Sequence, residues 1–141
     1  MTVRVGINGF GRIGRSIFRA RDLDSTFNDI EIVAINDLTD KTTLAHLLKY
    51  DSVMGTYGPM VSAIEKGLSV GDREIEIFNH RDPADIPWED LGVDYVIEST
   101  GLFTHFDKAS AHLDGGARKV VVSAPAKGEV KTIVMGVNED E

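Results

Sequence analysis

The sequence predicts an α/β fold, built as a doubly wound and mostly parallel sheet with an antiparallel hairpin insertion. Two observations lead to this prediction. The chain opens with a β-rich apolar run from Val3 to Asn8, a glycine turn, a helical pattern that begins at Arg12, and a second apolar run from Ile30 to Ile35, which together make a βαβ unit. Apolar runs and helical segments then alternate along the chain, which favours parallel strands covered on both faces.

Apolar periodicity, helix caps and turn residues predict the remaining elements. In chain order, we expect a helix capped by Thr39 or Asp40 that runs through Leu48, antiparallel hairpin structure within Met60–Asn79, a loop or short helical turn at Pro83–Pro87 that leads to Trp88, a strand at Tyr95–Glu98, a helix from about His105 to Leu113, a strand at Lys119–Ser123 and a final strand at Ile133–Val137.

The carboxyl ends of three expected strands are polar or small. They are Asn36-Asp37, Ser99-Thr100-Gly101 and Ser123-Ala124. Ligands of open α/β sheets bind outside the carboxyl ends of the strands, so we expect a binding crevice where these ends meet.

Composition limits the class of protein. The 141 residues are enough for one domain, residues 1–141, and 42% of them are hydrophobic, which is enough for a core. Fifteen Lys and Arg against 23 Asp and Glu give a net charge of -8, which opposes binding to nucleic acid or to an anionic membrane. There is no cysteine, hence no disulfide or thiol nucleophile within these residues. Without a signal peptide or a long apolar run, a soluble cytoplasmic protein is expected.

The glycine turn has the spacing G-x-G-x-x-G, with Gly9, Gly11 and Gly14 between a strand and a helix. Gly9 permits a tight turn, Gly11 lets backbone approach a pyrophosphate, and Gly14 allows close packing of helix on strand. The N–H groups of Arg12 and Ile13 then meet the pyrophosphate at the helix N-terminus, where the helix dipole favours an anion. This context predicts a Rossmann-type dinucleotide site.

An acidic residue at the end of the second strand completes the pattern. Asp37 lies 23 residues after Gly14, where an acidic side chain accepts hydrogen bonds from the adenosine ribose. Its charge repels the 2′-phosphate of NADP, so the expected cofactor is NAD. The alternative is that the glycines are ordinary turn residues and Asp37 is a helix cap; the complete strand, turn, helix and acid context favours the cofactor site.

Other polar and aromatic residues are expected to have structural roles. The four histidines show no zinc-ligand spacing, so no metal site is predicted, and all are expected on the surface: His46, His80, His105 and His112. Trp88 is expected to be a packing anchor. Three carboxylates are expected to form a solvated loop: Asp22, Asp24 and Asp29.

Six motifs, in order along the whole chain, resemble the glyceraldehyde-3-phosphate dehydrogenase family. They are Asn8-Gly9-Phe10-Gly11-Arg12-Ile13-Gly14-Arg15, Ile35-Asn36-Asp37-Leu38, His46-Leu47-Leu48-Lys49-Tyr50-Asp51-Ser52, Ser99-Thr100-Gly101, Ser123-Ala124-Pro125-Ala126-Lys127 and Met135-Gly136-Val137-Asn138. The resemblance implies that Arg12 and Ile13 bind the pyrophosphate, that Asp37 binds the ribose and that Arg81 lies on the adenine side. From residue type alone, an exposed Arg beside Asp82 is more often a surface ion pair, and only the family resemblance favours the adenine-side role for Arg81.

The resemblance also implies that Ser99, Thr100 and Ser123 line the crevice toward the nicotinamide. The full set of predicted cofactor-binding residues is Asn8, Gly9, Phe10, Gly11, Arg12, Ile13, Gly14, Asn36, Asp37, Arg81, Ser99, Thr100, Gly101 and Ser123. No catalytic residue is predicted in this chain.

The family oxidises an aldehyde phosphate by cysteine attack, hydride transfer to NAD and phosphorolysis of a thioester, with a histidine as base. The resemblance places that cysteine shortly beyond a stretch like Gly136-Val137-Asn138, so the catalytic domain is expected outside this chain. We therefore expect the NAD-binding half of a glycolytic, cytoplasmic homotetramer that converts glyceraldehyde 3-phosphate and inorganic phosphate to 1,3-bisphosphoglycerate. The isolated chain is expected to bind NAD without catalysing the reaction.

Two alternatives stay open from the sequence. One is the NAD domain of an erythrose-4-phosphate dehydrogenase, which shares the opening motif. Asn36-Asp37-Leu38 and Ser123-Ala124-Pro125 resemble the glycolytic enzyme more closely. The other is a non-catalytic nucleotide-binding module, which the absence of cysteine supports.

Overall fold

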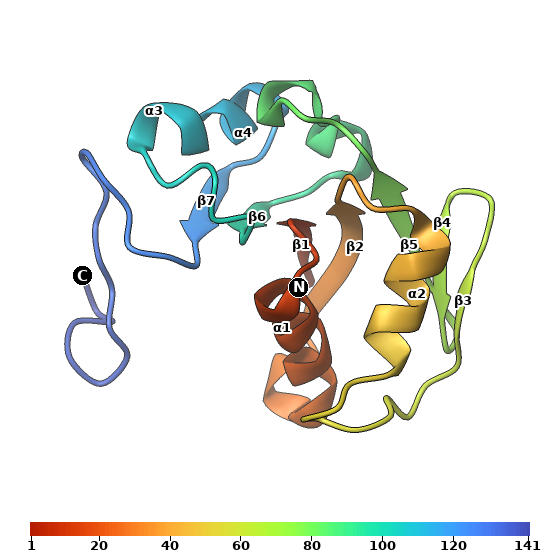
Figure 1. The fold of residues 1–141 in the computed structure, drawn as a ribbon. Coiled ribbons are helices and arrows are strands. Elements are labelled where there is room, and N and C mark those ends of the chain that lie inside the picture. Colours follow the sequence, from red (N-terminus) through yellow and green to blue (C-terminus); the bar gives the residue numbers. More distant parts are fainter.

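A seven-stranded sheet forms the centre of the computed structural model, which describes residues 1–141 (Figure 1). The strand order is β3-β4-β5-β2-β1-β6-β7. The strands are β1 (Val3–Asn8), β2 (Ile30–Asn36), β3 (Val61–Ala63), β4 (Gly67–Val70), β5 (Arg73–Phe78), β6 (Tyr95–Glu98) and β7 (Lys119–Val122). The helices are α1 (Arg12–Leu23), α2 (Lys41–Lys49), α3 (Phe106–Ala109) and α4 (Ala111–Asp114). Three 3₁₀ turns lie at Ser25–Phe27, Pro83–Asp85 and Trp88–Leu91.

Parallel pairing joins five neighbouring strands of the sheet, β5-β2-β1-β6-β7, whereas β3, β4 and β5 pair antiparallel. This confirms the predicted doubly wound, mostly parallel sheet with an antiparallel hairpin insertion. The hairpin is not a separate unit, because its last strand, β5, is also a parallel neighbour of β2.

The hydrophobic core lies on both faces of this sheet. On one face, Phe18 of α1 and Leu44 of α2 pack with β-strand residues such as Ile7 and Ile35, all almost fully buried. Phe18 also meets Phe10 edge to face, with ring centroids 5.8 Å apart. An amphipathic helix buries its apolar stripe in this way and gains most of its stability from that packing.

Trp88 anchors the opposite face, as expected. Its side chain is fully buried with Ile86, Val93 and Val96. The indole lies directly on Gly6 of β1, where an added Cβ would come within 2.4 Å of the ring. The missing side chain at Gly6 therefore makes room for the largest side chain of this core.

The segment Ile133–Val137 is not a strand, so that prediction is wrong. Residues 124–141 contain no helix or named strand, and their one sheet-like contact is a bridge between His105 and Lys127. A run of β-branched residues becomes a strand only when a neighbour supplies its hydrogen bonds. Here the segment lies apart from the free edge of β7 (Figure 1), and the Asn138 side chain instead accepts from Val134 N and donates to Thr132 O.

The expected helix from His105 to Leu113 is divided in two, α3 and α4, at Ser110. The Ser110 hydroxyl donates to the Asp107 carbonyl at 3.0 Å, a local bond that competes with regular helical pairing. The longest helix in the structure is α1, with 12 residues, and none of the helices is both long and apolar enough to cross a membrane.

Asp22 does not lie in a solvated loop, which corrects the prediction for this residue. It belongs to α1 and pairs with Arg21 at 3.1 Å and with Arg73 at 2.8 Å. It also accepts from the Tyr57 hydroxyl, so it joins α1 to the segment after α2. Spacing along the sequence gave no sign of these partners, because Arg73 lies 51 residues away.

Candidate functional site

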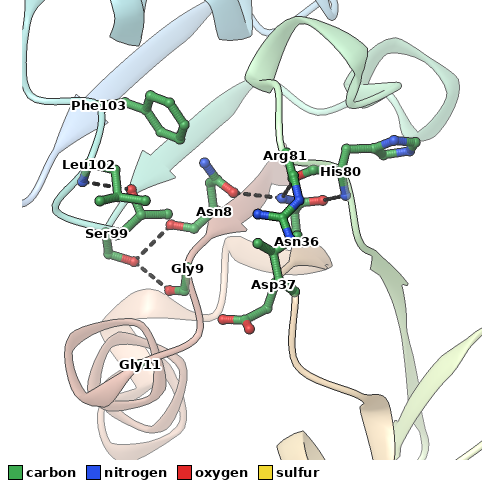
Figure 2. A pocket seen from close by; sticks show the side chains of 12 residues that line it. Asn8, Gly9, Gly11, Asn36, Asp37, His80, Arg81, Ser99, Leu102 and Phe103 are labelled. Carbon is green, nitrogen blue, oxygen red and sulfur yellow. Dashed lines mark hydrogen bonds between the residues drawn. The ribbon is translucent and has the colours of Figure 1, made fainter.

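A cleft of about 350 Å³ opens at the carboxyl ends of β1, β2 and β6, where the sequence predicts a binding crevice (Figure 2). The last residues of these strands are in register across the sheet: Asn8 of β1 pairs with Asn36 of β2 on one side and with Glu98 of β6 on the other. The cleft is lined by Asn8, Gly9, Gly11, Asn36, Asp37, Leu38, His80, Arg81, Ser99, Thr100, Leu102 and Phe103.

The glycine turn forms one wall of the cleft. Gly9 has φ of +92°, and an added Cβ would come within 2.7 Å of the Thr100 nitrogen, so both conformation and space require glycine there. The Ser99 hydroxyl donates to the Gly9 carbonyl at 2.7 Å and joins the turn to the loop after β6. These contacts hold the turn close to that loop.

Gly11 and Gly14 differ in what surrounds them. A Cβ on Gly11 would meet nothing within 4 Å, because this residue faces open space at the cleft. A Cβ on Gly14 would come within 2.3 Å of the Gly9 carbonyl oxygen. Gly14 therefore sets the close packing of α1 on the turn, and Gly11 leaves the approach to the helix free.

The N-terminus of α1 is open to a ligand. Gly11 is its N-cap residue and provides no side-chain cap for the first N–H groups. Such N–H groups, with the helix dipole, attract an anion. Ile13 is 54% exposed beside them. The Arg12 side chain pairs with Asp51 at 3.3 Å, and N–H bonds from Met54 and Val53 lower the pKa of Asp51 to about 2.

Asp37 connects the second strand to the glycine turn. One carboxylate oxygen accepts from Phe10 N at 2.8 Å and the other from Thr39 N at 2.9 Å. The alternative role of helix cap belongs instead to Asp40, which accepts from Thr43 N at the start of α2. Asp37 stays half-buried on the cleft wall with its charge toward the ligand space (Figure 2).

Asn36 fixes the loop that carries Arg81. Its amide accepts from His80 N at 2.8 Å and donates to His80 O at 2.9 Å. Arg81 is exposed on the cleft wall and makes no ion pair with Asp82, and the Asp82 carboxylate instead caps a 3₁₀ turn by accepting from Ala84 N. The interpretation of Arg81 and Asp82 as a surface pair is therefore wrong.

A buried polar network lies beneath the cleft. Glu98 accepts from Asn8 at 2.6 Å and from His112 Nε2 at 2.8 Å, and its second oxygen accepts from Thr100 N and from the Thr100 hydroxyl. Trp88 Nε1 donates to His112 Nδ1 at 3.1 Å. The prediction that all four histidines lie on the surface is wrong for His112, which is fully buried because these partners satisfy both ring nitrogens.

Glu98 is held as an anion despite its burial. Burial is the largest single influence and raises the pKa, but hydrogen bonds from His112, Thr100 and Asn8 together outweigh it and leave the pKa below its ordinary value of 4.5. A carboxylate with several donors is stabilised in this way even where water is excluded.

The structure brings together most of the predicted cofactor-binding residues, but not all of them. The predicted residues outside the lining of the cleft are Phe10, Arg12, Ile13, Gly14, Gly101 and Ser123. Phe10 is buried in the core, and Ser123 lies one residue beyond β7, where its hydroxyl donates to the Glu98 carbonyl at 3.3 Å. The lining residues that were not predicted are Leu38, His80, Leu102 and Phe103. Leu38, Leu102 and Phe103 could have been predicted from the sequence, because they directly follow the polar motifs at the strand ends.

Strand, glycine turn, uncapped helix N-terminus and an acidic residue at the next strand define a dinucleotide-binding domain of the Rossmann type. The family described as "Glyceraldehyde 3-phosphate dehydrogenase, NAD binding domain" matches residues 3–106. The chain belongs to this family, and it is an NAD-binding domain.

Relatives carry the same family name. The chain is 56% identical over its whole length to "Glyceraldehyde-3-phosphate dehydrogenase 1" of Streptomyces arenae, of which it covers 42%. It is 58% identical to the "Glyceraldehyde-3-phosphate dehydrogenase" of Streptomyces coelicolor and 56% identical to that of Geobacillus stearothermophilus, covering 41% of each. The chain thus spans about two fifths of the length of these relatives.

The two glycines with opposite surroundings allow a matched test of packing. We expect Gly14→Ala to lower the free energy of unfolding by about 1–3 kcal/mol, because the new methyl group overlaps the Gly9 carbonyl. Gly11→Ala should lower it by less than about 1 kcal/mol, since its Cβ meets open space and Ala is only a poorer N-cap. Urea denaturation measures both. Equal losses in the two variants would contradict this account of the turn.

Acid should weaken the fold through Glu98. Because its folded-state pKa is lowered, its contribution is fully present above about pH 4.5 and is lost as the pH falls through the folded value. The difference in unfolding free energy between the parent chain and Glu98→Gln should therefore shrink below pH 4.5. Denaturation from pH 3 to 7 tests this. The contributions of the other carboxylates to the unfolding free energy are the same in both chains and cancel in the difference. A difference that is constant with pH would refute it.

Proposed function

We propose that the cleft binds NAD with its pyrophosphate at the N-terminus of α1, its adenosine ribose at Asp37 and its adenine toward Arg81. The observation that carries this assignment is the uncapped first turn of α1 behind Gly11, where no Cβ obstructs an approaching phosphate. Backbone N–H groups there supply the donors and the dipole that a pyrophosphate needs. This fits an acidic chain, since the recognition requires no basic patch.

The nicotinamide half of the cofactor would lie on the other side of the glycine turn. Asn8, Ser99 and Thr100 line the cleft there, and Leu102 and Phe103 add apolar surface for a flat ring (Figure 2). When bound, NAD supplies the acceptor for a hydride. This chain's own residues would orient the cofactor.

We infer that the whole protein is a phosphorylating glyceraldehyde-3-phosphate dehydrogenase of glycolysis, with residues 1–141 as its NAD-binding domain and the reaction's catalytic groups outside these residues. The family assignment supports this, and every relative named above carries the same name rather than that of an erythrose-4-phosphate dehydrogenase. Within this chain there is no cysteine to attack the aldehyde. The one buried histidine, His112, is occupied by Glu98 and Trp88.

The proposal includes a homotetramer in the cytoplasm, as the sequence resemblance implies. Large apolar side chains remain exposed at Val121, Val134, Met135 and Val137, and association would cover surface of this kind. Light scattering on the protein that carries this chain would overturn the tetramer by showing a monomer across a wide concentration range.

Asp37 should determine the choice of cofactor. We expect Asp37→Ala to raise the Kd for NAD about tenfold, because a charged hydrogen bond to the ribose is lost. The variant should also discriminate less against NADP. Calorimetry with both cofactors measures this. Asp72→Asn, on the exposed turn between β4 and β5, is the control and should bind as the parent does. Unchanged NAD and NADP affinities in Asp37→Ala would contradict the assignment of the ribose end.

The isolated chain should bind NAD without producing NADH from glyceraldehyde 3-phosphate and inorganic phosphate. Absorbance at the NADH band is the readout, and the Geobacillus stearothermophilus relative serves as the positive control. NADH formation that depends on both aldehyde and phosphate would overturn the placement of catalysis outside these residues. Absence of NAD binding by the parent chain would overturn the proposed cofactor site itself.

A further inference from the structure

We propose that Glu98 is a positioning residue, whose buried carboxylate holds Asn8 and Thr100 in the geometry that the nicotinamide half of NAD requires. The inference rests on the proposed function of the cleft as the NAD site. Glu98 itself does not line the cleft, but Asn8 and Thr100 do.

The carboxylate is enclosed by donors alone. Its side chain is 1% exposed, and its two oxygens receive Asn8 Nδ2 and His112 Nε2 on one side and the N–H and hydroxyl of Thr100 on the other. Four donors around one group require an acceptor with no hydrogen of its own. Only an ionised carboxylate meets this condition.

Neither end of the network can reverse its direction. At one end, the amide of Asn36 is oriented by the backbone N–H and C=O of His80, and it donates to Asn8 Oδ1 at 2.8 Å, which leaves the Asn8 amide nitrogen to face Glu98. At the other end, the Trp88 indole can only donate, so His112 accepts at Nδ1 and carries its hydrogen on Nε2. The donor and acceptor of every hydrogen bond in the network are therefore fixed, and the donors from both ends point at the Glu98 carboxylate.

The same carboxylate controls two walls of the cleft. Through Asn8 it holds the end of β1, directly before the glycine turn. Through Thr100 it holds the loop after β6, and the Thr100 hydroxyl in turn accepts from Leu102 N at 3.1 Å. A ligand that bridges the turn and this loop depends on the distance between them. A ligand that uses only Asp37 and the N-terminus of α1 does not.

Replacement by the isosteric amide separates the two cases. In Glu98→Gln the new NH₂ group must face donors, whichever way the amide turns, and the tautomer of His112 cannot change because Trp88 occupies Nδ1. We expect the Kd for NAD to rise about tenfold, and the Kd for ADP, which carries only the adenosine and pyrophosphate, to change less than twofold. Calorimetry with NAD and ADP on the 141-residue chain makes the measurement, with Glu74→Gln, at an exposed position of β5, as the control.

A second pair of variants keeps the test decisive if Glu98→Gln does not fold, as judged by circular dichroism and by the emission of the single Trp88. Thr100→Val removes the hydroxyl donor and keeps the shape, while Thr100→Ser keeps the donor. Thr100→Ser should retain more NAD affinity than Thr100→Val, with equal ADP affinity in both. If Thr100 and Glu98 only stabilised the fold, the affinities for ADP and NAD would fall together.

The outcomes distinguish the proposed NAD site from the positioning role of Glu98. A parent chain that binds neither NAD nor ADP overturns the proposed function. A parent chain that binds both, with NAD affinity unchanged in Glu98→Gln, overturns the positioning role. Parallel losses of NAD and ADP in Glu98→Gln overturn it too, because they show a general loss of structure rather than control of one half of the cleft.

Discussion

The constraint on which the site depends is a single buried negative charge at the end of the central strands. Glu98, Asn8 and Asn36 end three adjacent parallel strands in register, and their side chains are joined by hydrogen bonds under the cleft. Burying an anion is expensive unless donors surround it. Once they do, every partner is fixed in direction, so the strand ends, the loop after β6 and the helix carrying His112 are held together by one group.

The features that sequence could predict are those set by local backbone rules. Gly9 needs a left-handed conformation, Gly14 lacks room for a Cβ, and Gly11 opens the helix N-terminus, as each position in the motif predicts. Asp37 likewise follows the last residue of β2 directly, as the motif predicts. These signals lie within about 30 residues of each other, and apolar periodicity carries the rest of the alternating pattern. The fold class and most of the cleft could therefore be predicted.

The features that could not be predicted depend on partners far apart in the chain. Asn8 and Glu98 are 90 residues apart, and Trp88 and His112 are 24 apart, so no spacing rule marks His112 as a buried acceptor rather than a surface residue. The strand prediction for Ile133–Val137 was wrong because composition is not sufficient. The segment favours a strand by its residues, but a strand also needs a neighbour with free hydrogen-bonding groups. Local preference is a property of the segment, whereas burial and pairing are properties of the assembled fold.

Charge along the cleft follows an order that a net charge of -8 conceals. A carboxylate, Asp37, lies at one end, the positive pole of α1 lies in the middle, and the buried anion Glu98 lies beneath the other end. NAD in the proposed orientation has the complementary order: ribose hydroxyl donors, then the pyrophosphate anion, then the nicotinamide cation. The domain can thus be acidic overall and still bind an anionic cofactor, because backbone N–H groups meet the phosphates. In the proposed orientation Asp37 would face the ribose hydroxyls, and the negative charge of Glu98 would lie beneath the nicotinamide cation.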